Sequence, residues 1–338
     1  MLVAVKRILI SLLTLAMLVI SIGLAASWWL LQQPLSNLQH GQLLEISRGA
    51  NAGTTVRLLA RENLLKFPRL AYYSSRIWVN PAHLKAGVYQ LEPGLTLRSF
   101  WQRLEQGQQH QFQITLIEGQ TWRQWQQQLQ QQPYLQGRSQ QLNENELLKA
   151  IAGPAATYLS LEGLLMPDTF SYQAYSDDLT LLRQAHQKLL AELQLQWQQR
   201  ADNLPYKNPY ELLIMASIIE KETGMDGERA LVSSVFVNRL NANMRLQSDP
   251  TTIYGIDDFD GNLTRVHLRQ ETPYNTYRIA GLPPTPIAMV SRASLAAAAQ
   301  PAQSDYFYFV ADGSGGHVFS QTYEQHQQAV NRYQRKQR

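Results

Sequence analysis

Two glutamates near the end of one predicted helix could perform acid–base chemistry. Glu220 shares a helix face with Leu213, Ala216 and Ser217, which precede it by seven, four and three residues. A carboxyl group beside apolar and small neighbours is poorly hydrated, and poor hydration favours the protonated form that a general acid needs. The small neighbours also leave room for a bulky substrate. Glu220 is therefore the predicted general acid, whereas Glu222 points about 200° away on the same helix.

Two later segments offer groups that could bind a sugar. Residues 246–251 (Leu-Gln-Ser-Asp-Pro-Thr) gather polar side chains at a turn, and residues 274–277 (Tyr-Asn-Thr-Tyr) alternate aromatic with hydrogen-bonding groups. Sugar rings stack on aromatic faces, and their hydroxyls pair with amides and hydroxyls. The predicted substrate-binding residues are Ser217, Gln247, Asp249, Tyr274, Asn275, Thr276 and Tyr277.

All of these residues also have an ordinary structural explanation. Glu220 and Glu222 could form the polar end of an amphipathic helix, Asp249 could cap a helix, and tyrosine-rich loops often serve packing alone. The residue pattern by itself leaves both interpretations open.

The helix that carries Glu220 is predicted at 209–223. It opens with Asn208, Pro209 and Glu211, which supply an N-cap, a proline in the first helical position and a capping-box glutamate, and Gly224 ends it. Apolar spacing and turn residues predict further elements, namely helices at 179–195, 228–240 and 291–299 and a hairpin that pairs 306–310 with 317–319.

A short pattern, Gly-x-Thr-x-Arg, recurs three times before residue 125, beginning at Gly53, Gly94 and Gly119. In each copy the threonine could cap a following helix, and the last two copies follow strand-like runs at 87–91 and 112–117. The glycine spacings of 41 and 25 residues are unequal, which excludes a solenoid of fixed period. The pattern favours one or two small α+β modules.

The N-terminus contains a predicted membrane span. From Ile8 to Leu31 there are 24 consecutive residues without a charge, longer as a helix than the roughly 30 Å hydrocarbon core. Lys6 and Arg7 precede the span, which predicts a cytoplasmic tail at 1–7, a transmembrane helix at 8–31 and export of all that follows. The alternative is a signal peptide cleaved near Ser27.

Composition excludes several classes of function. The 338 residues suggest about two folded units, and 30 Lys+Arg against 26 Asp+Glu give no basic face for nucleic acid. The chain has no cysteine, so disulfide frameworks, thiolate zinc sites and cysteine nucleophiles are excluded.

Several segments together resemble one family. They occur in the family's order and comprise 84–89, 162–170, 216–223 (Ala-Ser-Ile-Ile-Glu-Lys-Glu-Thr), 235–240, 246–251, 274–277, 281–288 and 308–313. The chain resembles the endolytic murein transglycosylases of the YceG-like (MltG) family, and Glu220 is taken as the match to the family's catalytic glutamate.

The resemblance implies an α+β protein with a LysM-like periplasmic module or modules at 32–154 and a YceG-like catalytic domain at 155–338. It implies a single-pass protein of the bacterial inner membrane, with the N-terminus cytoplasmic and the catalytic domain periplasmic. The implied substrate is the nascent glycan strand of peptidoglycan, and the implied partner is a synthase complex of penicillin-binding proteins. Neither a cofactor nor a metal is implied.

The implied reaction is that of a lytic transglycosylase, a carbon–oxygen lyase acting on polysaccharides. It cleaves the bond between N-acetylmuramic acid (MurNAc) and N-acetylglucosamine (GlcNAc) and leaves a 1,6-anhydro-MurNAc end. Two alternatives remain open: a hydrolytic muramidase, in which Asp249 or another acid activates water, and a non-catalytic wall-binding scaffold.

Overall fold

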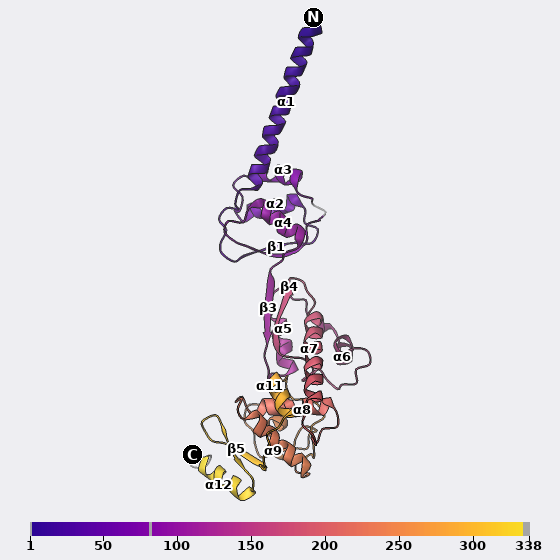
Figure 1. Cartoon of the computed structure of the whole chain (residues 1–338), viewed down its shortest axis with the longest axis vertical. Coiled ribbons are helices and arrows are strands. Elements are labelled where there is room, and N and C mark those ends of the chain that lie inside the picture. Colours follow the sequence, from indigo (N-terminus) through magenta and orange to yellow (C-terminus); the bar gives the residue numbers. More distant parts are fainter. Residues whose placement is uncertain (1, 81–82, 334–338) are drawn as a thin grey trace. The chain divides into compact units, whose positions relative to one another are not determined.

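The computed structural model describes residues 2–80 and 83–333 (Figure 1). Its chain forms two compact units, one of residues 1–112 and 171–176 and the other of residues 113–170 and 177–338. Residue 1 of the predicted tail and residues 334–338 of the predicted catalytic domain lie outside the described residues. The domain boundary predicted near residue 155 stays a prediction.

The fold is mixed α+β, as the sequence predicts, and the structure shows it to be mostly helical with small two-stranded sheets. The first unit holds α1 (Leu2–Leu31), β1 (Gln42–Ile46), α2 (Ala52–Arg61), α3 (Pro68–Trp78), β2 (Gly87–Leu91) and α4 (Leu97–Gln106). Strands β3 (Gln111–Leu116) and β4 (Asp168–Gln173) pair with each other. The second unit continues with α5 (Trp122–Gln130), the 3-10 turn η2 (Ser139–Gln141), α6 (Glu144–Ala152), α7 (Asp178–Gln198), α8 (Pro209–Glu222), α9 (Arg229–Asn241), α10 (Asp249–Tyr254), the 3-10 turn η3 (His267–Arg269), α11 (Arg292–Ala299), β5 (Tyr308–Ala311), β6 (His317–Ser320) and α12 (Tyr323–Tyr333).

The first unit is built on one antiparallel pair, β1 with β2, in which Leu44 lies opposite Tyr89. Alternate residues of β1 are buried, and they pack on the apolar faces of α2 and α4. Leu31, the last residue of α1, belongs to this same core and is 2% exposed. The long apolar helix therefore ends inside the packed unit.

Threonine caps confirm two of the three repeated patterns. Thr96 and Thr121 accept hydrogen bonds from backbone N–H groups three residues later and begin α4 and α5. The third expectation, that Thr55 caps a helix, is wrong. Asn51 caps α2 through a reciprocal capping box with Thr54, and Thr55 is buried one turn inside the helix.

Helix α8 forms the centre of the second unit, where it packs against α7, α9, α10 and α11. Every residue from 212 to 219 is buried, because this run of apolar and small side chains meets a neighbouring helix on each side. Asn208 caps the helix by accepting from the Glu211 N–H at 3.0 Å, as predicted. The carboxylate of Glu211 reaches one residue further back than a capping box requires, to the Lys207 N–H at 2.7 Å. The predicted helices at 228–240 and 291–299 are confirmed as α9 and α11, and the predicted hairpin as the antiparallel pair β5–β6.

Candidate active site

The two glutamates of α8 lie in different surroundings. Oε2 of Glu220 accepts hydrogen bonds from the Ser291 N–H at 2.9 Å and from the Ser291 hydroxyl at 2.5 Å. Ser291 is the N-cap of α11, so Glu220 joins the end of α8 to the start of a second core helix. These contacts describe a carboxylate that holds two helices together.

Glu222 faces a cavity of about 380 Å³. In the described part of the chain, the residues that line this cavity include Glu222 and do not include Glu220. Oε1 of Glu222 accepts a hydrogen bond of 2.5 Å from the hydroxyl of buried Ser248, which precedes α10. Glu222 therefore contacts Ser248 and lines the cavity at the same time.

Burial raises the pKa of Glu222 to about 7, and the negative charge of Asp249 adds to the increase. The hydroxyl of Ser248 and the positive charges of His317 and Arg239 act in the opposite direction but are outweighed. A carboxyl group with a pKa near neutrality can both donate and accept a proton at physiological pH. Glu222 thus has the raised pKa that a general acid needs near neutral pH.

Aromatic side chains form much of the cavity wall. Tyr308 stacks on His326 with ring centroids 5.2 Å apart, and the guanidinium of Arg239 lies over the same tyrosine ring at 5.2 Å. Arg239 is held in place because its Nε–H donates to the Phe307 carbonyl and its Nη1 donates to the Leu246 carbonyl. Flat apolar faces beside a fixed cation suit a ring substrate that carries hydroxyl and amide groups.

Three of the predicted substrate-binding residues line this cavity, namely Gln247, Asp249 and Tyr277. The Tyr277 hydroxyl donates to Oδ1 of Asp249 at 2.7 Å, so these two side chains hold each other in position. Gln247 has a positive φ of 51°, a conformation that non-glycine residues rarely adopt. The loop is therefore shaped specifically around the cavity.

The other predicted substrate-binding residues are not among the residues that line this cavity in the described part of the chain, and they make hydrogen bonds within the protein. Ser217, Asn275 and Thr276 are fully buried. The Ser217 hydroxyl accepts from the Ile287 N–H, and the Asn275 amide donates to three backbone carbonyls, one of them that of Gln270 at 2.6 Å.

Thr276 and Tyr274 are also engaged within the protein. The Thr276 hydroxyl accepts from the Ser248 N–H at 2.9 Å, and the Tyr274 hydroxyl lies 2.9 Å from the hydroxyl of Thr285. A direct contact of these four supporting residues with substrate stays a prediction, as does the role of Glu220.

The spacing signal that predicts Glu220 is also present for Glu222. Met215, Ile218 and Ile219 precede Glu222 by seven, four and three residues, so the same argument from poorly hydrated neighbours applies to it. Ser248 and the aromatic residues of β5 and α12 offered no such signal, because only the folded chain brings them to α8.

Comparisons with known proteins identify the family of the chain. The YceG-like family model matches residues 44–332, and the chain belongs to this family. A relative from Bacillus subtilis (strain 168), named endolytic murein transglycosylase, is 28% identical over 307 residues, which cover 86% of this chain and 84% of the relative.

Two further comparisons agree. A protein of the same name from Streptococcus pneumoniae serotype 2 is 31% identical over 166 residues, 47% of this chain and 29% of that protein. The crystal structure of a yceG-like protein from Listeria monocytogenes matches with a TM-score of 0.53 and 26% identity, covering 86% of this chain and 98% of the other.

Proposed function

We propose that this protein is an endolytic peptidoglycan transglycosylase that cleaves the MurNAc–GlcNAc bond of nascent glycan strands and leaves 1,6-anhydro-MurNAc ends. The family and the names of the relatives support the substrate and the reaction class. The single observation that carries the proposal is a carboxyl group of raised pKa facing a cavity with aromatic walls.

Glu222 is the proposed general acid, in place of Glu220. Its proton would pass to the bridging oxygen of the glycosidic bond while positive charge develops at C1 of the muramic sugar. The resulting carboxylate would then take the proton of that sugar's C6 hydroxyl as its oxygen bonds to C1. One carboxyl group serves both steps, and the leaving GlcNAc keeps the first proton as its new hydroxyl.

The remaining groups of the cavity would position the sugar. Asp249 and Tyr277 form a hydrogen-bonded pair that could bind hydroxyl groups, and the aromatic side chains of the cavity wall could pack against the sugar ring. Ser248 would orient the carboxyl group of Glu222 through its 2.5 Å hydrogen bond. Four other predicted residues would position the substrate indirectly, through the hydrogen bonds that they make within the protein, namely Ser217, Tyr274, Asn275 and Thr276.

The proposal extends to the whole chain. Helix α1 is long and apolar enough to be an anchor or a signal sequence. We take it as an uncleaved anchor in the inner membrane, with the N-terminus cytoplasmic and residues 32–154 serving as LysM-like modules that bind or place the glycan. Residues 155–338 would form the periplasmic catalytic domain, which would act beside a synthase complex of penicillin-binding proteins.

The deciding experiment compares two isosteric variants of the full-length protein on purified glycan strands. Glu222→Gln keeps the size of the side chain but cannot release a proton, so cleavage should fall by about 10²–10⁴-fold. Glu220→Gln is the matched control, two residues earlier on the same helix, and should retain most of the activity. If only Glu220→Gln loses cleavage, the general acid is Glu220, the residue predicted from the sequence, and the assignment of Glu222 is wrong.

The products distinguish a transglycosylase from a muramidase. Cleavage in ¹⁸O-labelled water should give ends that carry no label, are one water lighter than a reducing end and resist borohydride. Labelled, reducible ends would identify a hydrolase with the same substrate, and intact strands with every preparation would favour a wall-binding scaffold.

A further inference from the structure

Helix α3 has its polarity reversed relative to an ordinary surface helix. Its fully buried side chains are small, namely Ala71, Ser74 and Ser75, and Tyr72 is partly buried against the same core. Its large apolar side chains, and that of Phe67 just before it, face outward with exposed fractions of 56% for Phe67, 57% for Leu70, 64% for Tyr73, 55% for Ile77 and 44% for Trp78. A surface helix normally buries this stripe, so the outward face needs an apolar environment.

Helix α3 packs beside the apolar helix α1 (Figure 1). The indole N–H of Trp78 donates to the Ser27 hydroxyl at 3.1 Å, and the rings of Trp28 and Trp78 meet edge to face at 5.1 Å. In a helix, the twenty residues from Ile8 to Ser27 span about 30 Å, the thickness of a hydrocarbon core. The contact with Ser27 therefore lies near the outer boundary of that core.

A cavity of about 570 Å³ between the two helices fixes the depth of α3 more closely. Ile20 and Leu24 line it from α1, and Leu70, Tyr73 and Ile77 line it from α3. Ile20 and Leu24 lie in the outer half of the apolar span, so the side chains of α3 that share the cavity lie at hydrocarbon depth. If water filled this cavity, the apolar faces of both helices would be exposed to it, which is energetically unfavourable.

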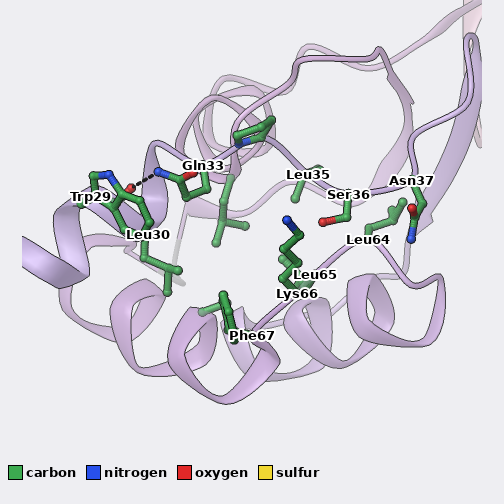
Figure 2. A pocket seen from close by; sticks show the side chains of 13 residues that line it. Trp29, Leu30, Gln33, Leu35, Ser36, Asn37, Leu64, Leu65, Lys66 and Phe67 are labelled. Atoms are coloured by element: carbon green, nitrogen blue, oxygen red, sulfur yellow. Dashed lines mark hydrogen bonds between the residues drawn. The ribbon is translucent and has the colours of Figure 1, made fainter.

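A second cavity, of about 440 Å³, marks the change from apolar to polar surroundings (Figure 2). Trp29, Leu30 and Phe67 line it, and so do the side chains of Gln33 and Lys66. From Lys66 to Trp78 the chain carries Lys66, Arg69 and Arg76 and no acidic residue. Cations beside an embedded apolar face can extend to the phosphates of the lipid headgroups.

We propose that α3 is an interfacial helix whose outward face, formed by Phe67, Leu70, Tyr73, Ile77 and Trp78, is embedded in the outer leaflet of the membrane that α1 spans. Lipid acyl chains fill the cavity between α1 and α3, and Lys66, Arg69 and Arg76 meet the headgroups. This inference rests on the anchoring role proposed for α1. The first unit is then fixed on the membrane surface through two elements, which limits its freedom to tilt.

The absence of cysteine from the sequence makes a direct test possible, because every introduced cysteine can be spin-labelled alone. The variants are Leu70→Cys and Ile77→Cys on the outward face, Leu18→Cys within the apolar span and Leu43→Cys as control. Leu43 is also an exposed leucine, at 42%, but it lies on β1, on the opposite side of the first unit from α1 (Figure 1). Each full-length variant is reconstituted in vesicles of phosphatidylethanolamine and phosphatidylglycerol, and collision of the label with oxygen and with a water-soluble nickel chelate is measured.

We expect the labels at 18, 70 and 77 to collide more with oxygen than with the nickel chelate, and the label at 43 to do the reverse. Labels at 70 and 77 that favour the chelate, with the label at 18 in lipid, would overturn the inference and leave the anchor intact. A label at 18 that favours the chelate would refute the anchor itself. If the labels at 70 and 77 are shielded from both reagents, the outward face of α3 is covered by protein and not by lipid, which would also overturn the inference. None of these three outcomes bears on Glu222, whose test is cleavage.

Discussion

At the scale of single residues, the two glutamates of α8 differ in what each carboxyl group contacts. Glu220 accepts two hydrogen bonds from Ser291, whereas Glu222 accepts one from Ser248 and faces a cavity. Two residues of the same type, nearly adjacent in sequence, thus have different surroundings. The difference leads to a prediction that depends on pH.

Cleavage should decline as the pH rises through about 7, because a general acid acts in its protonated form and burial raises the pKa of Glu222 to about 7. Asp249→Asn removes a negative charge that favours the protonated form, so it should move this decline to lower pH. The measurement is kcat/KM against pH for both proteins. A midpoint that is unchanged or higher in the variant would contradict the assignment of Glu222, whatever happens to the maximal rate.

At the scale of elements, the contact between α8 and α11 should matter for stability rather than for catalysis. Glu220→Ala removes the acceptor of a charge-assisted hydrogen bond, and we expect a loss of about 1–3 kcal/mol in the free energy of unfolding. Ser291→Ala removes the N-cap of α11 and should cost about 1 kcal/mol. Denaturant unfolding of the two variants and the double variant measures both values and the coupling between them.

The double variant provides the control. Because the two side chains share one interaction, the combined loss should be smaller than the sum of the single losses. Strict additivity would mean that Glu220 does not act through Ser291.

The repeated Gly-x-Thr-x-Arg patterns also determine where helices begin. Two of them begin α4 and α5, and the Glu118 side chain next to the last pattern is exposed. A charge at the start of a helix is worth about 0.3–1 kcal/mol, so Glu118→Gln should leave turnover within a few-fold of the unchanged protein. Steady-state cleavage measures this, and a loss as large as that of Glu222→Gln would mean that the active site is assigned wrongly.

At the scale of the whole molecule, the charge pattern around α1 predicts the topology. Lys6 and Arg7 lie near the start of α1, before its uncharged run, and the last residue of this helix, Leu31, is packed in the first unit. A reporter fused after Arg338 should therefore be active in the periplasm, and the mature protein should keep its N-terminus. N-terminal sequencing checks the second point, and a mature form that begins near Ser27 would show that α1 is a signal peptide.

The sequence alone determined the local structure and the family. Asn208 and Pro209 start α8, threonine caps begin α4 and α5, and the uncharged run gives α1, because caps and apolar spacing act within a few residues. It erred at Thr55, where Asn51 was the stronger competitor for the same cap. Periodicity also indicated correctly that Glu220 and Glu222 point in different directions.

Only the tertiary structure decided what each of those directions meets. The partners of the two carboxyl groups are Ser291 and Ser248, which lie 71 and 26 positions away, and part of the cavity wall comes from residues beyond 300. The outward face of α3 likewise becomes meaningful only where it packs beside α1. Burial and charge depend on neighbours in space, and helical spacing specifies a direction without specifying what lies there.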